Sequence, residues 1–288
     1  MKWKRKIALA TLVLIIAAVS LRALRQPREP EYDGQPLSYY LSSLTYSQVR
    51  LEGNARSAIR EIGSNAVPPI IEILNARESR FKTWFNEMAD HQSLTRFRFA
   101  PLVNRQMQAA MACGELGPIA APAIPSLARL VDDPVLGYLA VAALADIGPQ
   151  TFPLLTNALT SCTPSTRFAA VGHLRLMRPR ERALPLLLAA LRSEEFNMRA
   201  MAAESLGALG LRTPDVVSAL SAALADPNTD VRLSAARSLG WCGEAAACTV
   251  PRLIELHRSL EGAPEQQQVA EALASIDPAA AQRAGIAK

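Results

Sequence analysis

Side chains that carry out chemistry are scarce in this chain of 288 residues. It contains three histidines and four cysteines, and aromatic residues make up only 5% of it. His91, His173 and His257 lie far apart, none belongs to a His-Glu-x-x-His motif, and no Cys-x-x-Cys pair occurs. A glycine-rich loop ending in Lys-Ser or Lys-Thr, the pattern of a phosphate-binding loop, is missing as well. Because zinc and nucleotide sites depend on such spacings, we expect no catalytic residues, no cofactor and no metal.

An excess of basic charge is also missing outside one short segment. The formal net charge is +5, but residues 1–28 hold seven lysines and arginines and no acidic residue. The rest of the chain therefore has 24 basic residues against 26 acidic ones. A surface that binds nucleic acid needs clustered Lys and Arg to neutralise phosphates. We therefore expect no nucleic-acid partner.

The basic segment precedes the one long apolar run. MKWKRK is followed by almost uninterrupted apolar residues from Ile7 to Leu21. This pattern is typical of a secretory signal or an uncleaved anchor, although a full membrane span needs about 20 apolar residues. We expect residues 1–24 to be a signal-anchor that leaves the rest of the chain facing the periplasm. Cleavage near Ser20, with release into the periplasm, is the alternative.

A helical pattern recurs through the rest of the chain. Apolar residues stand one and four positions before each of seven anchor positions, and a small residue, alanine in six copies and valine in one, stands eight positions before it. This spacing places the three residues on one face of a helix, and glycine at an anchor tolerates the left-handed conformation that ends a helix. The anchors are Gly63, Gly117, Gly148, Arg178, Gly210, Gly243 and Asp277.

A second apolar segment with an early proline follows the anchors, as in APAIPSLARLV (121–131) and CTVPRLIEL (248–256). Proline suits the first turn of a helix, and polar turns such as DPNTD (226–230) separate the units. A single helix pair cannot bury both of its apolar faces, whereas stacked pairs form a continuous core. The sequence therefore predicts an all-α fold, an α-solenoid of about seven helix pairs.

Two copies carry a family resemblance. NMRAMAAESLGALG (197–210) and DVRLSAARSLGWCG (230–243) resemble HEAT repeats, in the short bacterial form known as HEAT-like repeats of the phycobilisome-lyase type. The resemblance implies that Arg167, Arg199 and Arg232, each eleven residues before its anchor, bind loop carbonyls or an aspartate of the adjoining repeat. The equivalent positions 106 and 137 hold Gln and Gly, so we expect this ladder of arginines to be interrupted there.

The resemblance covers about residues 54–283. We divide the chain into the signal-anchor or signal peptide (1–24), a linker with an N-terminal helix (25–53), a divergent first repeat with an aromatic insert (54–104), the regular array (105–283) and a tail (284–288). The insert and the segment LSYYLSSL (37–44) resemble the N-terminal part of anchored bacterial HEAT-repeat proteins. The insert is interpreted either as a cap over the first repeat or as an aromatic docking site that uses Trp84, Phe85, Phe97 and Phe99.

HEAT repeats imply a non-catalytic interaction scaffold whose partner is a protein, and the N-terminal segment implies that this scaffold is tethered to the membrane. We expect the second helices to line the inner surface of the array. The candidate partner-binding residues on or near them are Glu72, Arg129, Asn157, Arg192, Arg252, Glu255 and Arg258.

Two alternatives remain for function. One is an accessory protein or enzyme that handles a chromophore or small ligand, as phycobilin lyases of this repeat type do. The other is a structural spacer in an envelope complex. Deoxyhypusine hydroxylases, which are HEAT-like enzymes, bind iron through His-Glu pairs, and this chain has none. If the array lies outside the cytoplasm, Cys242 and Cys248 are close enough in sequence for a possible disulfide.

Overall fold

The computed structural model describes residues 29–44, 49–78, 101–161 and 163–286. The signal-anchor predicted for 1–24 and the aromatic residues Trp84, Phe85, Phe97 and Phe99 lie outside these residues. Within the described ranges, no helix is long and apolar enough to cross a membrane.

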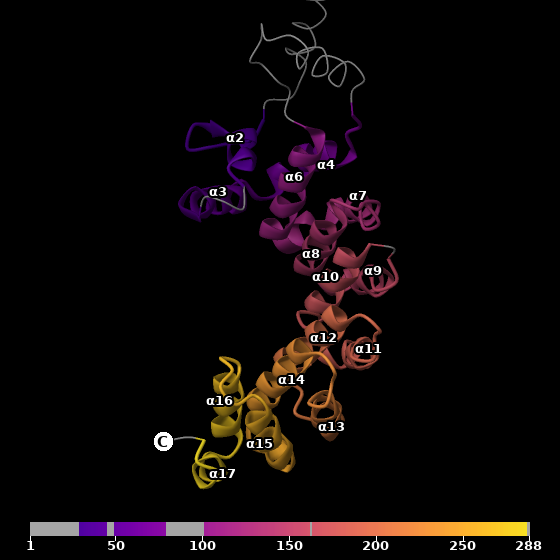
Figure 1. Ribbon diagram of the computed structural model, residues 1–288. Helices are drawn as coiled ribbons and strands as arrows, with labels where there is room; N and C mark the ends of the chain where they lie inside the picture. The colour runs from indigo at the N-terminus through magenta and orange to yellow at the C-terminus, as the bar shows by residue number, and fades with distance from the viewer. Residues whose placement is uncertain (1–28, 45–48, 79–100, 162, 287–288) are drawn as a thin grey trace, which may run out of the picture.

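Seven helix pairs follow one another through the described residues, so the all-α solenoid is confirmed (Figure 1). The first helices of the pairs are α3 (Val49–Ile62), α6 (Leu102–Leu116), α8 (Gly137–Ile147), α10 (Pro164–Leu174), α12 (Phe196–Leu209), α14 (Thr229–Cys242) and α16 (Gln266–Ile276). The second helices are α4 (Val67–Asn75), α7 (Ile124–Ala128), α9 (Phe152–Ala158), α11 (Leu184–Ala190), α13 (Pro214–Ala223), α15 (Val250–Ser259) and α17 (Pro278–Arg283). Short 3-10 turns join five of the pairs, at 63–66, 117–123, 149–151, 180–182 and 243–249.

Six of the seven first helices end directly before their anchor position, whereas α10 ends at Leu174, four residues before Arg178. Gly210 takes a left-handed conformation, with φ of 73°, directly after α12. A residue with a Cβ is strained at such a φ, and glycine is not. The other four anchor glycines also have positive φ values; they are Gly63, Gly117, Gly148 and Gly243. At Asp277 the chain turns without glycine, and the aspartate side chain instead accepts a hydrogen bond from the backbone N–H of Ala280 in α17.

The second helices begin with proline. Each of the seven has a proline at its first or second position. Proline lacks an N–H, but the first turn of a helix has no partner for that group in any case. The leucines that follow point inward, and Leu127, Leu155, Leu187, Leu220 and Leu253 are fully buried. Proline therefore starts each second helix, and its leucines fix it to the core.

Small residues bring the first helices close together. The alanines eight positions before the anchors are at most 1% exposed. A Cβ added at Gly207 of α12 would lie 2.5 Å from the Cβ of Ser238 in α14, closer than side chains can approach. A Cβ added at Gly240 would lie 3.1 Å from the Cα of Ala272 in α16. The backbones of α12, α14 and α16 therefore approach closely because these positions lack bulk.

The two rows of helices differ in how tightly they pack. The most extensive contacts in the array are between successive first helices, whereas successive second helices contact each other little. In Figure 1 the array is curved. The first helices, from α3 to α16, lie on its inner side, and the second helices lie on its outer side. The expectation that the second helices line the inner surface was therefore wrong. The small residues of the first helices shorten that row, and the second helices spread apart along the longer one.

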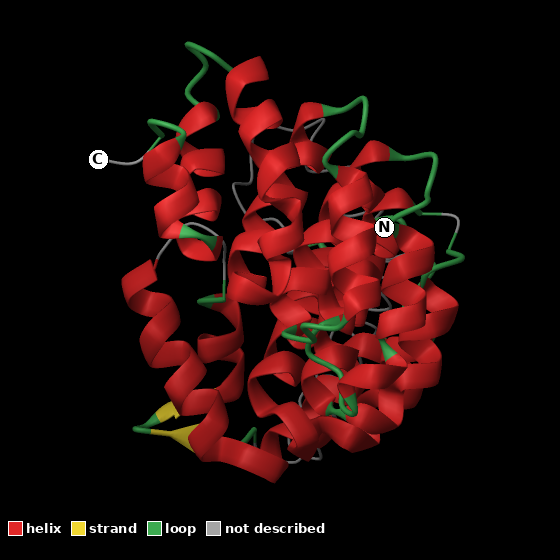
Figure 2. Ribbon diagram, turned by 90° about the horizontal axis from the view of Figure 1, so that it is seen from below, coloured by secondary structure: helices red, strands yellow, loops and turns green. Residues whose placement is uncertain are grey.

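A small hairpin at the N-terminal end was not predicted. Strands β1 (Glu31–Tyr32) and β2 (Gln35–Pro36) pair antiparallel, and Figure 2 shows them at one edge of the described structure, whose other regular elements are helices. Asp33 and Gly34 connect the strands with φ values of 47° and 70°, the conformation that an Asp-Gly hairpin turn requires. Helix α2 (Leu37–Ser42) follows, and its Tyr40 donates a hydrogen bond of 2.7 Å to the carbonyl of Tyr32.

Candidate protein-binding grooves

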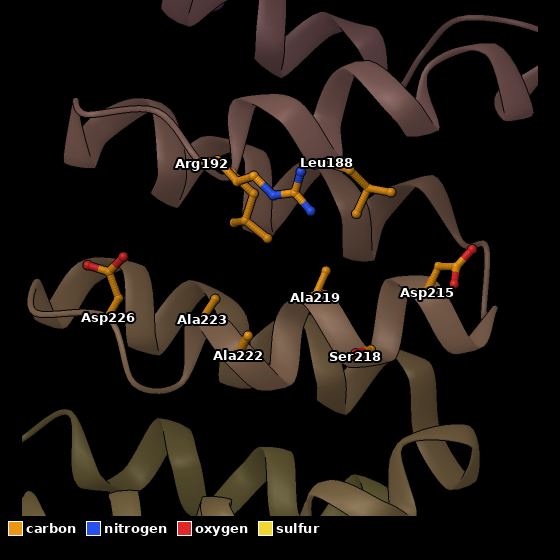
Figure 3. A pocket seen from close by; sticks show the side chains of 9 residues that line it. Leu188, Arg192, Asp215, Ser218, Ala219, Ala222, Ala223 and Asp226 are labelled. Atoms are coloured by element: carbon orange, nitrogen blue, oxygen red, sulfur yellow. The ribbon is translucent and has the colours of Figure 1, made fainter.

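A groove runs between α11 and α13 on the outer side of the array. It has a volume of about 570 Å³. We call it the α11–α13 groove, and its lining residues are Leu188, Leu191, Arg192, Asp215, Ser218, Ala219, Ala222, Ala223 and Asp226. Figure 3 shows Leu188 and Arg192 on one wall, facing the small side chains of α13 on the other. The groove is open because Ser218, Ala219 and Ala222 are too short to reach across it.

Charges lie along this groove in an alternating order. Arg192 is exposed near the middle, while Asp215 and Asp226 stand at opposite ends of α13 (Figure 3). Among the described residues Arg192 makes no ion pair, whereas Asp226 pairs with Arg199 at 2.7 Å. The hydrogen bonds from Arg199 hold the pKa of Asp226 below its usual range. Arg192 is therefore available to a partner, and Asp226 is largely neutralised from within the chain.

A second groove lies on the other side of α13, between α13 and α15. It has a volume of about 600 Å³, and we call it the α13–α15 groove. Its lining residues are Ser221, Ala222, Leu224, Ala225, Arg232, Arg252, Glu255, Leu256 and Ser259. Arg252 extends from α15 toward α13 and donates hydrogen bonds of 3.1 Å to the carbonyl and the hydroxyl of Ser221. Ala222 lines both grooves, so the two grooves are adjacent and α13 separates them.

The arginine ladder holds the turns that frame these grooves. Arg167 donates to the carbonyl of Ser161, and its guanidinium pairs with Glu195 of the next turn. Arg199 donates to the carbonyls of Ser193 and Glu194. Each of these arginines therefore fixes its own turn and the next one.

The interruptions of the ladder have different structural causes. Gln106 stands at the ladder position of α6 and still donates to the carbonyls of Leu74 and Ala76, at 3.1 and 3.3 Å. The prediction of an interruption there was wrong for the carbonyl contacts, because an amide N–H replaces the guanidinium N–H. At Gly137 an added Cβ would lie 2.4 Å from the carbonyl oxygen of Val131, so no side chain fits.

The predicted partner-binding residues reach these grooves only in part. Arg192 lines the α11–α13 groove, and Arg252 and Glu255 line the α13–α15 groove. The others are exposed on or beside the same row of helices but line neither groove; they are Glu72, Arg129, Asn157 and Arg258. Arg129 donates to the side chains of Asn75 and Ser126. The sequence pattern did not single out Asp215 or the small face of α13, although the run SALSAA (218–223) carries that signal.

A third hollow lies on the side of the first helices, among α8, α10 and α12. It has a volume of about 620 Å³ and is largely apolar, with Tyr138, Phe168, Met198 and Met201 in its lining. His173 also lines it, and among the described residues its Nδ1 has no hydrogen-bond partner. Burial, followed by the nearby Arg175, lowers the pKa of His173. The imidazole is therefore held in its neutral form.

The described cysteines are free thiols. Cys242 is buried at the end of α14, whereas Cys248 is exposed in the turn after it. The disulfide considered from their spacing is therefore not formed, because the two side chains face different environments. Cys113 is buried too, and its burial raises the thiol pKa to about 12. Among the described residues, no group of three or more His, Cys, Asp and Glu could hold a metal ion.

Comparison with known families identifies the repeat. The family model for HEAT repeats matches residues 132–207, 151–240 and 184–274. The chain is a HEAT-repeat protein. The matched HEAT repeats run through α8–α16 and include both walls of each groove on the outer side. A search of curated protein sequences finds no match.

Several solved structures are similar to this HEAT-repeat chain. The complex of CpcE and CpcF of phycocyanin lyase from Nostoc sp. PCC7120 is 19% identical, with a TM-score of 0.42, over 88% of this chain and 98% of that one. Kap95p, from a structure with RanGDP, is 17% identical, with a TM-score of 0.46, over 89% of this chain and 36% of that one. Human deoxyhypusine hydroxylase is 18% identical, with a TM-score of 0.34, over 92% and 90% of the two chains.

Proposed function

We propose that this HEAT-repeat protein is a non-catalytic scaffold that binds an extended segment of a protein partner on its outer face. The observation that carries the proposal is the pair of adjacent grooves on the two sides of α13. An extended peptide places side chains at regular intervals, and neighbouring hollows in a repeat array suit such a ligand. The partner would cross α13 at Ala222, the residue that lines both grooves.

The character of the lining supports a protein ligand. The α11–α13 groove contains Leu188 and Leu191 for apolar contact, with Arg192 and Asp215 for polar contact. Neither groove carries a stripe of one charge sign, which a polyanion would require. Protein interfaces combine apolar pockets with a polar rim in this way, and arginine is enriched among the side chains that contribute most to binding.

Site-specific photo-crosslinking tests this proposal. A photoreactive residue replaces Ala219 inside the α11–α13 groove in one variant and Arg237 of α14, outside both grooves, in the control. We expect one partner to be cross-linked in cells from position 219 and not from position 237. The partner is then purified and its affinity for the full chain is measured. Arg192→Glu should weaken binding about tenfold, a loss of about 1.4 kcal/mol.

Two outcomes would contradict the scaffold. Equal cross-linking from positions 219 and 237 would indicate non-specific contact. A chromophore in the absorption spectrum of the purified chain, released from an Arg192→Glu variant, would favour the ligand-handling alternative instead.

We also propose that the scaffold is tethered to the cytoplasmic membrane through residues 1–24. The support is the cationic head and the apolar run from Ile7 to Leu21. A reporter that is active only outside the cytoplasm, fused after Lys288, tests the orientation. We expect activity from a membrane-bound product of full length. A shortened product in the soluble fraction would instead indicate cleavage near Ser20, and an inactive reporter would contradict the periplasmic orientation.

A further inference from the structure

The three arginines of the ladder share one hydrogen bond. In each, one terminal nitrogen donates to the backbone carbonyl six residues earlier. The three distances are 2.7 Å from Arg167 to Ser161, 2.9 Å from Arg199 to Ser193 and 2.9 Å from Arg232 to Asp226. Each arginine therefore has further N–H groups that this carbonyl does not use.

At the first two arginines, the next repeat supplies a carboxylate that accepts hydrogen bonds from the guanidinium. Arg167 binds Glu195, 28 residues later. Arg199 binds Asp226, 27 residues later, through its Nε and a terminal nitrogen at 2.7 and 3.0 Å. This two-bond contact uses the fork of the guanidinium fully, and such pairs are among the stronger hydrogen bonds in proteins. The carboxylate is thus a regular part of the ladder.

The third arginine has no such carboxylate. The positions 27 and 28 residues after Arg232 hold Ser259 and Leu260. Besides the turn carbonyls, Arg232 donates only to the hydroxyl of Thr229, at 2.9 Å, among the described residues. Glu261 follows in the same turn, but it forms no ion pair with Arg232 within the described part of the chain. The place that Glu195 and Asp226 fill in the two preceding repeats is therefore empty of acid here.

That place opens into the α13–α15 groove. Arg232 and Ser259 both line the groove, and Arg252 lines it from α15. Arg252 uses one terminal nitrogen to bind Ser221, and its remaining N–H groups have no partner among the described residues. The groove therefore contains two arginines against the one carboxylate of Glu255, and neither arginine is neutralised by an ion pair in the described residues.

We infer that the α13–α15 groove binds an aspartate or glutamate side chain of the protein partner, which completes the third position of the ladder. The inference rests on the proposed scaffold function and adds the chemistry of its partner. The incoming carboxylate bonds to Arg232 as Asp226 bonds to Arg199, and Arg252 approaches it from the opposite wall. Guanidinium groups suit this role because their N–H groups form a rigid, planar fork that matches a carboxylate.

A selection of displayed peptides on the full chain tests the inference. The probe is a library of random twelve-residue peptides, and the affinities of the selected peptides are measured on purified protein. We expect peptides with a shared Asp or Glu, whose change to Asn or Gln weakens binding at least tenfold, about 1.4 kcal/mol. Arg252→Gln should cause a similar loss. Arg237→Gln, which removes an exposed arginine outside the groove, is the matched control and should leave binding unchanged.

A carboxylate supplied from within the chain gives a second, independent measurement. Ser259→Asp should occupy Arg232, raise the melting temperature of the protein and weaken the acidic peptides at least tenfold. In the background of Arg232→Gln, the same Ser259→Asp change should no longer raise the melting temperature. These readouts separate a carboxylate site at Arg232 from a general effect of charge on the surface.

Other results would overturn the inference. Selected peptides without an acidic residue, failure to select any peptide, or acidic peptides whose affinity is unaffected by Arg252→Gln and Ser259→Asp would each do so. If binding depends on Arg192 alone, the scaffold remains and the acidic ligand is wrong. Failure of the scaffold itself is seen separately, in the cross-linking from position 219.

Discussion

At the scale of single residues, the pair of Arg199 and Asp226 connects the stability of the array to pH. Arg199 joins the turn before α12 to the turn before α14, and the two side chains are 15% and 11% exposed. The hydrogen bonds from Arg199 lower the pKa of Asp226 and raise that of Arg199, so both stay charged at neutral pH. A carboxylate whose pKa is lowered on folding stabilises the folded state above its unfolded pKa of about 4.

We predict that Asp226→Asn lowers the free energy of unfolding at pH 7 by about 1.5–3 kcal/mol, the contribution of hydrogen bonds to charged groups. The difference from the unchanged protein should shrink as the pH falls below about 4, because the unfolded chain then takes up a proton at Asp226 while the folded chain does so only at its lower pKa. Urea unfolding of both proteins between pH 7 and pH 2.5 measures this. A difference that is constant with pH would show that the charge of Asp226 contributes nothing. Asp215→Asn, at an exposed aspartate with no ion pair among the described residues, is the control.

At the scale of the elements, close packing between first helices depends on positions with little or no side chain. Gly207 in α12 faces Ser238 in α14, and both residues are buried. The Cα of Ser238 would lie only 2.8 Å from a Cβ at position 207, so a backbone would have to move to admit one methyl group. Glycine inside a helix lowers the stability of that helix relative to alanine. The close packing of α12 against α14, which glycine allows, offsets this loss.

We predict that Gly207→Ala destabilises the protein by about 1–3 kcal/mol, the usual cost of overpacking a core. Gly53→Ala in α3 is the matched control, because nothing lies within 4 Å of a Cβ added there. By helix propensity alone, that control should stabilise the protein by about 0.5–1 kcal/mol. Thermal and urea unfolding measure both variants. A stabilising Gly207→Ala would mean that α12 and α14 separate at little cost.

At the scale of the whole molecule, the two rows of helices produce the bend and the grooves together. The first helices pack on one another along the inner side, and the second helices spread along the outer side (Figure 1). The same small residues that tighten one row therefore help to open the α11–α13 and α13–α15 grooves in the other. A repeat in the middle of such an array is held by two neighbours, and a repeat at its end by one.

We predict that amide hydrogen exchange follows this arrangement. Helix α12 packs between α10 and α14, whereas α17 lies at the end of the array. Amides of α12 should therefore exchange at least about tenfold more slowly than those of α17, because local opening of α17 breaks fewer contacts. Hydrogen exchange measured by mass spectrometry, corrected for intrinsic rates, tests this. Equal protection in α12 and α17 would show that the array opens only as one cooperative unit.

Most of the fold follows from local chemistry that the sequence displays. The alanine, leucine and glycine columns determined the first helices, and early prolines determined the second, because helix faces and helix ends depend on residues near in the chain. The Asp33-Gly34 hairpin follows from local sequence too, because Asp-Gly is a favoured two-residue hairpin turn.

The candidate site depended on tertiary structure to a greater extent. Arg192, Arg252 and Glu255 were identified as exposed residues on second helices, yet nothing local distinguished them from Glu72 or Asn157. Which row lies on the inner side is set by the sum of small displacements between neighbouring helices, such as the approach of Gly207 to Ser238. The carboxylate missing opposite Arg232 is likewise visible only when residues 27 and 28 positions apart are seen to meet in the two preceding repeats. By itself, therefore, the sequence determined the repeating unit, whereas packing between units decided the bend, the grooves and the partners of their charges.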